Sequence, residues 1–204
     1  NINYSKVLYS AFDDFISGPT AQSTSNDWQY FEINTDRSGA SFLSNWQPEG
    51  TTNIPNYGQW DNNRDFASFP LVQKVGDSGT IVSGYGPTFT GPALVMHPNN
   101  SDTFNCGLGY KNNTGGTINV NIDIALSLLF GTTYNLTGVN YFIQRGLLND
   151  ARYKLYVNSS IPEKSTDTFT FNKKNIELQN GEFIYLIINR NGNFEWDFTR
   201  VVFN

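Results

Sequence analysis

Cysteine, long apolar stretches and charge are all scarce in this chain of 204 residues. The single cysteine, Cys106, excludes a disulfide within the chain and any zinc site built from several thiolates. No run of about 18 apolar residues is present, and residues 1–6, NINYSK, lack the basic and apolar regions of a signal peptide. We therefore expect a soluble, mature chain without membrane insertion.

Charge is low and slightly acidic. Charged residues make up 15% of the chain, with 13 Lys and Arg against 18 Asp and Glu, which gives a net charge of −5. This balance disfavours the phosphates of nucleic acids and anionic membrane surfaces as general partners. We expect no nucleic-acid binding and a neutral partner.

Apolar and aromatic residues are plentiful by comparison. Hydrophobic residues make up 38% of the chain, and 16 Phe and 11 Tyr supply most of the aromatic rings. This is enough material for a core, so the chain as a whole should not be disordered. Asn, Gly, aromatic and β-branched residues outnumber the strong helix formers, which is typical of strands and turns. The composition predicts one all-β domain over residues 28–204, preceded by an N-terminal arm or short strand at 1–27.

Eleven short segments have the composition of strands and are separated by turn signals such as HPNNSD and NNTGG. They are residues 28–33, 40–44, 69–75, 93–97, 103–110, 117–130, 140–145, 152–158, 167–172, 182–189 and 196–203. Many short strands at fairly regular spacing predict an antiparallel β-sandwich.

Two of these segments show a two-residue period. Apolar and polar residues alternate strictly over 117–124, TINVNIDI, so one face of this strand should be buried and the other wet. In 152–158, Tyr153, Leu155 and Val157 alternate with neighbours that are polar except for Tyr156, so this strand is also expected to be amphipathic, with these three residues on its apolar face.

Residues 45–65, NWQPEGTTNIPNYGQWDNNRD, form the longest segment without a strand or helix pattern. Long loops in compact domains are often functional. Aromatic rings in this loop, with one more in GYGPTF, would stack on the apolar face of a sugar, and nearby amide and guanidinium groups would bond its hydroxyls. The candidate ligand-binding residues are Trp46, Tyr57, Gln59, Trp60, Asn62, Arg64 and Tyr85. The alternative is that the loop folds back and its tryptophans plug the ends of the sandwich.

The same loop contains a candidate metal site. Asp61, Asn63 and Asp65 have the D-x-N-x-D spacing that lets alternate oxygen ligands face one hard cation. An EF-hand is excluded because Phe66 stands where that loop needs a glycine. The hypothesis is a simple loop that binds structural Ca²⁺, and the alternative is a turn rich in Asp and Asn.

Catalytic groups are few. The only imidazole, His97, precedes a proline and is interpreted as a turn residue, and Cys106 lies in an apolar strand pattern where a buried thiol is the ordinary outcome. Glu195 and Asp197 would point to the same side of a strand, but a glycosidase needs two carboxylates about 5–10 Å apart, which sequence spacing cannot establish. We predict no enzymatic activity, with a glycosidase or lyase as the alternative.

Several short motifs occur in a suggestive order. An aromatic opening strand at Trp28 and Tyr30 is followed by HPNN at 97–100, TGGTINVNI at 114–122, NGEFIYLIINRNGN at 180–193 and WDFTRVVF at 196–203. Over about residues 27–204 this order resembles the jelly-roll β-sandwich domains of extracellular bacterial proteins, among them carbohydrate-binding modules. The resemblance implies a non-catalytic domain that binds a glycan through aromatic platforms or polar loop groups, often beside a structural calcium.

Together these observations predict non-catalytic binding of a neutral polysaccharide or cell-surface glycan. An adhesion module of a phage tail or cell surface that recognises a host saccharide, and a structural spacer without a ligand, are the alternatives. In each case the expected setting is secreted: extracellular, on a cell surface or on a virion, within a larger protein or assembly.

Overall fold

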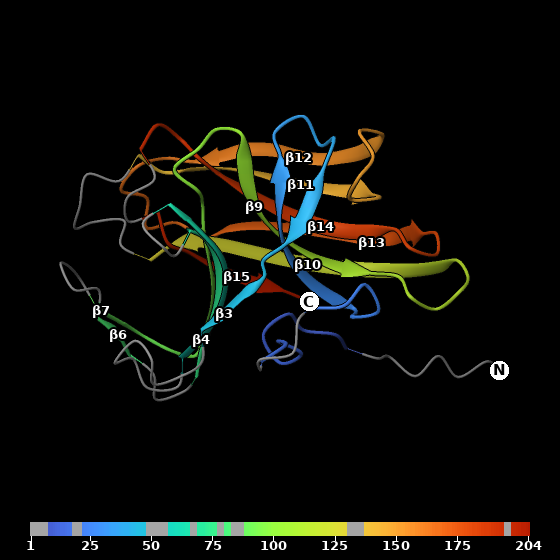
Figure 1. Ribbon diagram of the computed structural model, residues 1–204, viewed down its shortest axis with the longest axis horizontal. Coiled ribbons are helices and arrows are strands. Elements are labelled where there is room, and N and C mark those ends of the chain that lie inside the picture. Colours follow the sequence, from blue (N-terminus) through green and yellow to red (C-terminus); the bar gives the residue numbers. More distant parts are fainter. Residues whose placement is uncertain are drawn as a thin grey trace.

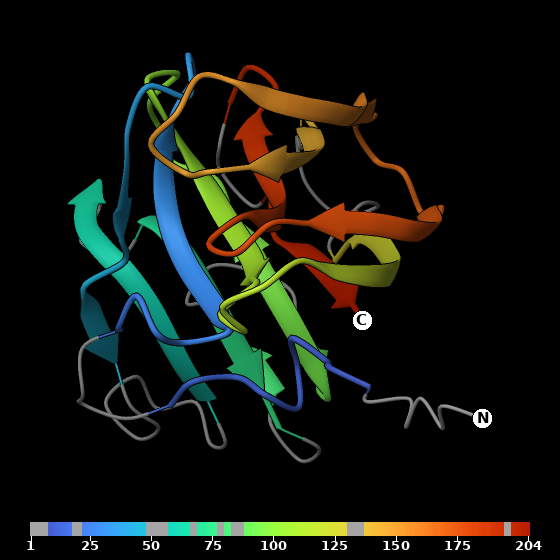
Figure 2. The same cartoon turned by 90° about the vertical axis from the view of Figure 1, so that its right-hand side faces the viewer.

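The computed structural model describes residues 8–17, 22–47, 57–65, 69–76, 80–82, 88–129, 137–193 and 197–204. In these ranges every regular element is a β-strand, and two antiparallel sheets pack face to face (Figures 1 and 2). The predicted all-β antiparallel sandwich is therefore confirmed. Within the same ranges, no helix has the length and hydropathy needed to cross a membrane.

The six-stranded sheet has the strand order β12-β11-β14-β9-β1-β2, and every neighbouring pair is antiparallel. Its strands are β1 (Trp28–Asn34), β2 (Ala40–Phe42), β9 (Phe104–Lys111), β11 (Val139–Gly146), β12 (Tyr153–Ile161) and β14 (Phe183–Arg190).

The seven-stranded sheet has the order β13-β10-β15-β8-β5-β4-β3 and is also antiparallel throughout. Its strands are β3 (Asn45–Gln47), β4 (Tyr57–Asp65), β5 (Phe69–Val75), β8 (Ala93–His97), β10 (Ile118–Leu128), β13 (Phe169–Leu178) and β15 (Thr199–Phe203). A separate two-stranded ribbon, β6 (Thr80–Val82) and β7 (Thr88–Thr90), lies on the side of the molecule where β3 and β4 are found (Figure 1).

The last eight strands alternate between the two sheets in a regular order. Strands β8, β15, β10 and β13 are neighbours in one sheet, and β9, β14, β11 and β12 are neighbours in the other. The chain therefore crosses between sheets at each connection from β8 to β15 except the β11–β12 hairpin. This order is consistent with a jelly roll, which β1 and β2 extend at one edge of the six-stranded sheet and β3 to β5 extend at one edge of the other.

All eleven predicted segments contain strands, and two of them, 69–75 and 93–97, have the predicted bounds. The prediction that residues 45–65 form a structureless loop is wrong, because the segment contributes both β3 and β4. These strands carry Asn, Gln and Asp at alternate positions, and such residues normally signal turns, so their pattern concealed the strands.

The main core lies between the two sheets and is rich in aromatic contacts. Trp28 packs edge-on against Phe203 and Tyr110, with ring centroids 5.0 and 5.6 Å apart. The alternation predicted for 117–124 is confirmed, because Ile122 and Ile124 are buried in this core while the intervening polar residues are exposed.

The N-terminal segment packs into the same core. Within residues 8–17, Ala11 and Phe15 are buried, and the backbone N–H of Ala11 donates to the carbonyl of Phe203 at 2.9 Å. The Phe15 ring lies 4.9 Å from that of Tyr30. This part of the predicted arm therefore packs against the sandwich.

The buried face predicted for β12 is reversed over half of its length. On β12, Val157 pairs with Ile143 of β11, but Leu155 pairs with the next residue, Gln144, so Tyr156 is an extra residue in a bulge. A bulge turns the following side chains to the other face of the sheet. Tyr153 and Leu155 are consequently exposed, and Tyr156 packs beside Phe171 of the opposite sheet.

Candidate functional site

The residues predicted to bind a sugar are divided between two faces of one sheet. Trp46 and Trp60 pair directly across β3 and β4 and lie on the core side, with ring centroids 5.2 Å apart. Gln59 and Asp61 flank Trp60 in sequence, so the two-residue period of a strand points them to the opposite side. Of the predicted ligand residues, Trp60 and Gln59 therefore point to opposite faces of the sheet.

Trp60 is not an exposed platform. Its side chain is 1% exposed, and its indole Nε1–H donates to the carbonyl of Ile16 at 2.8 Å. Trp46 is half-buried and contacts Phe15 at 6.3 Å between centroids. The alternative interpretation, in which these tryptophans fold inward and plug the sandwich, describes Trp60 correctly.

The remaining predicted ligand residues are only partly placed. Asn62 is half-buried, and its Oδ1 accepts hydrogen bonds from the backbone N–H and the hydroxyl of Ser44 at 3.3 and 3.4 Å. Tyr57 and Arg64 belong to β4, but their side chains lie outside the described part of the structure, as does the whole of Tyr85.

Asp61, the first predicted calcium ligand, is buried within a cluster of side-chain amides. Its Oδ1 accepts from Asn45 Nδ2 at 2.7 Å, and its Oδ2 accepts from Gln47 Nε2 at 2.8 Å and Gln59 Nε2 at 2.6 Å. The side chains of Asn63 and Asp65 lie outside the described residues, among which no group of three acidic, His or Cys side chains is arranged to hold a metal. Calcium at these three positions stays a prediction.

Replacing Asp61 by asparagine should lower the free energy of unfolding by about 1–3 kcal/mol, because an amide N–H₂ would face donors where a carboxylate oxygen accepted them. Urea denaturation measures this change. The matched control is Asp123→Asn, an exposed aspartate on β10, which should leave stability within about 0.5 kcal/mol of the wild type. Equal stability of the two variants would show that the hydrogen bonds from the three amides to the Asp61 carboxylate contribute little to the free energy of unfolding.

The candidate catalytic groups His97 and Cys106 are both buried. The His97 ring stacks on Phe69 at 4.1 Å between centroids and meets Phe198 edge-on at 4.4 Å, and burial lowers its pKa to about 3. The thiol of Cys106 is buried against the carbonyl of Leu71 at 3.3 Å, and burial raises its pKa. Both geometries agree with structural roles.

The predicted acid pair of Glu195 and Asp197 is only half placed. Glu195 lies outside the described residues, whereas Asp197 precedes β15 and is fully buried. Burial raises the pKa of Asp197 to about 8, with a smaller opposing effect from the backbone N–H of Gly138.

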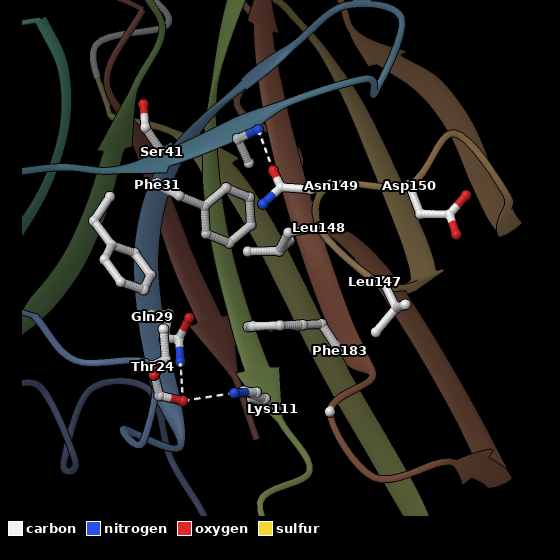
Figure 3. A pocket seen from close by; sticks show the side chains of 13 residues that line it. Thr24, Gln29, Phe31, Ser41, Lys111, Leu147, Leu148, Asn149, Asp150 and Phe183 are labelled. Carbon is white, nitrogen blue, oxygen red and sulfur yellow. Dashed lines mark hydrogen bonds between the residues drawn. The ribbon is translucent and has the colours of Figure 1, made fainter.

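A groove of about 570 Å³ lies elsewhere, on the outer face of the six-stranded sheet, which is the face turned away from the other sheet (Figure 3). Its floor depends on two glycines of β9. A Cβ atom at Gly107 would overlap the ring of Phe31, and one at Gly109 would lie 2.9 Å from Cβ of Tyr185 and 3.2 Å from Cδ1 of Phe183. The rings from β1 and β14 therefore lie across the bare backbone of β9.

One wall of the groove comes from the loop between β11 and β12. Figure 3 shows Leu148 pointing between Phe31 and Phe183, with Leu147 at the outer side. The backbone N–H of Ala40 in β2 donates to Asn149 Oδ1 at 2.7 Å, which joins this loop to the far edge of the sheet. The loop thereby encloses an apolar space that the flat sheet alone would not provide.

Polar groups lie at the two ends of the groove. At one end, Lys111 Nζ donates to the carbonyl of Thr24 at 2.6 Å, and Gln29 Nε2 donates to the same carbonyl at 3.2 Å (Figure 3). At the other end, Asp150 forms a bidentate pair with Arg152, whose hydrogen bonds lower the pKa of the carboxyl to about 2.

Sequence reasoning missed this groove, although β9 carried one signal of it. Two glycines two positions apart on one face of a strand indicate close approach by other groups. In FNCGLGY that signal is present at Gly107 and Gly109, but nothing in the sequence shows which rings approach them.

The chemistry of the groove suits a ligand with one apolar face and a polar rim. Its volume falls in the range of about 300–1,000 Å³ that small-molecule sites occupy. The chain matches no protein-family profile and no curated protein.

Proposed function

We propose that this protein is a non-catalytic saccharide-binding domain and that the groove of the six-stranded sheet holds the saccharide. The observation that carries the proposal is the accessible apolar lining of the groove, which comes from Phe42, Leu147 and Leu148. This lining lies above the buried rings of Phe31 and Phe183, between polar groups at both ends of the groove. A sugar ring has an apolar face that packs on such apolar side chains and hydroxyls that exchange water for polar protein groups. A spacer without a ligand would need no such groove.

The groove favours binding over catalysis. A glycosidase needs two carboxylates about 5–10 Å apart. Among the described residues that line the groove, Asp150 is the one carboxylic acid, and it is already bound to Arg152. The proposed setting is extracellular, on a cell surface or virion, where the domain would attach a larger protein to a glycan, as an adhesion module does.

Replacing Leu147 by alanine should weaken saccharide binding about three- to tenfold, because this wall residue loses apolar area that a ligand would cover. Its side chain is 46% exposed, so the fold should tolerate the change. A glycan array first identifies the saccharide, and titration calorimetry then measures affinity.

The matched control is Leu155→Ala. Leu155 is 45% exposed and lies on the same face of the sheet, but it does not line the groove. The Leu155→Ala variant should bind the saccharide with the affinity of the wild type. If both leucine variants bind alike, the saccharide lies elsewhere, and if no saccharide on the array is retained, the proposed function is wrong.

A further inference from the structure

The outer face of the six-stranded sheet differs in charge from the chain as a whole. The strand register assigns outward positions to apolar residues, amides, glycines, Ser160 and one lysine, Lys111. The acidic residue of β1, Glu32, pairs with Cys106 and faces the other way. No outward position on the six described strands carries a carboxylate, although the net charge of the chain is −5.

Lys111 forms no ion pair with a carboxylate of the described residues. It is half-buried at the end of β9, its Nζ donates to the carbonyl of Thr24, and it lies 5.9 Å from the centroid of the Phe183 ring. Among the described residues, no carboxylate lies within ion-pair distance of this ammonium. Since an ammonium has three donors, it can bind an anionic group as well as the Thr24 carbonyl.

A second cation strengthens the positive field on this face. Arg37 is 3% exposed, and its guanidinium lies 4.9 Å from the centroid of the Phe142 ring. Its hydrogen-bond partners are the neutral Gln144 Oε1 and the carbonyls of Asn34 and Thr35. A buried charge with neutral partners is screened less by solvent than a surface charge.

The acidic groups nearby do not cancel this field. Asp150 forms a bidentate pair with Arg152, so the pair adds no net charge to the groove. Asp36, next to Arg37 in sequence, is exposed, and its carboxylate accepts hydrogen bonds from the backbone and hydroxyl of Ser38. Asp27 lies opposite Lys111, whose backbone N–H donates to the Asp27 carbonyl. The exposed Asp27 carboxylate, however, accepts from Asn113 Nδ2 and does not line the groove. Among the described residues that line the groove, the charge without an ion-pair partner is therefore that of Lys111.

We infer that the groove prefers an anionic saccharide, with a carboxylate or sulfate ester bound at Lys111 and the sugar ring packed on the accessible apolar lining of the groove. This inference rests on the proposed function and refines the neutral partner expected from overall charge. A net charge of −5 is an average over the surface, whereas a ligand responds to the groups within about 10 Å of it at moderate ionic strength.

The experiment compares matched saccharides that differ only in charge. The probes are oligomers of galacturonate, hyaluronan and alginate, each with its carboxyl-reduced counterpart, and carrageenan oligomers with their desulfated counterparts. Calorimetry at low and at physiological ionic strength should show at least one charged probe binding about three- to tenfold more tightly than its neutral counterpart. The ratio of the two affinities should fall as the salt concentration rises. If the preference is found with the carboxylated probes, the groove binds a carboxylate, and if it is found with the carrageenan probes, the groove binds a sulfate ester.

Lys111→Met should bring that ratio close to one while affinity for the neutral counterpart and the melting temperature stay near those of the wild type. Lys111→Arg should retain the preference. Lys174→Met is the control, because it removes the same charge from an exposed position on β13 in the other sheet.

Two results would overturn the inference alone: neutral probes bind the wild type as tightly as charged ones, or Lys111→Met keeps the preference. In both cases Leu147→Ala would still weaken neutral binding, so the proposed function would stand. Failure of every probe, charged and neutral, would remove the proposed function together with this inference.

Discussion

Replacing Trp60 by alanine should lower the free energy of unfolding by about 3–5 kcal/mol, the usual cost of removing a large aromatic side chain from a core. The ring is buried between Trp46 and the N-terminal segment, and its Nε1–H satisfies the carbonyl of Ile16. Alanine would leave a cavity and remove that hydrogen bond at the same time. The loss should appear in urea denaturation as a lower midpoint with a similar slope.

Trp46→Ala is the matched comparison. Trp46 is only half-buried on the neighbouring strand, so its replacement should lower the free energy of unfolding by less than that of Trp60. If Trp60→Ala were as stable as the wild type, the ring would not be part of the core, and its earlier interpretation as a sugar platform would return. Any loss of saccharide binding in Trp60→Ala has to be measured where the variant is still folded, since unfolding alone would abolish binding.

Replacing Asp197 by asparagine should stabilise the protein by about 2–5 kcal/mol at pH 8 and leave it nearly unchanged at pH 4. Asp197 is fully buried, and neither carboxylate oxygen has a hydrogen-bond partner of good geometry. The nearby backbone N–H of Gly138 offsets only part of the effect of burial on the pKa. Burial raises the pKa of this group from 3.8 to about 8 in the folded protein. Asparagine has nearly the same shape and cannot ionise, so the variant avoids a buried charge.

The direction of the pH dependence follows from proton binding. Below pH 4 the carboxyl is protonated in both states, so it does not oppose folding. Between pH 4 and pH 8 the unfolded chain loses the proton while the folded protein keeps it, so wild-type stability falls as the pH rises. Above pH 8 both states are ionised and this contribution becomes constant.

Unfolding curves between pH 4 and pH 9 for the wild type and Asp197→Asn measure the effect. The difference between the two proteins should grow with pH and then level off near pH 8. The exposed Asp167 offers a control, because Asp167→Asn should follow the wild-type curve. Parallel curves for the wild type and Asp197→Asn would mean that this carboxyl ionises normally in the folded state.

The fold class was predictable because its signals are local. The strict alternation of residues 117–124 and the apolar run of residues 93–97 each identify a strand without reference to the rest of the chain. Strands β3 and β4 were not predictable in the same way. Gln59 and Asp61 look like loop residues, and only their bonds to one another and to β3 explain how they are buried.

Residue types that indicate sugar binding were recognised in the sequence, but their placement was not. Trp60 and Gln59 are neighbours in the chain and lie on opposite faces of one strand. On β12, a bulge at Tyr156 shifts the two-residue alternation of side chains by one position. Leu155, which the sequence pattern assigned to the buried face, is exposed as a result. A shift of one residue reverses the face of every side chain that follows, and a bulge leaves no reliable mark in a single sequence.

The groove depends on tertiary structure alone. Its floor and polar end join Phe31 of β1, Lys111 of β9 and Phe183 of β14, and the loop at Leu148 closes it. These residues are far apart in the chain, and they meet because the sheet order places β9 between β1 and β14. Local patterns determine which segments are strands, whereas the order and register of strands decide which side chains share a face. That order is set by packing over the whole sandwich.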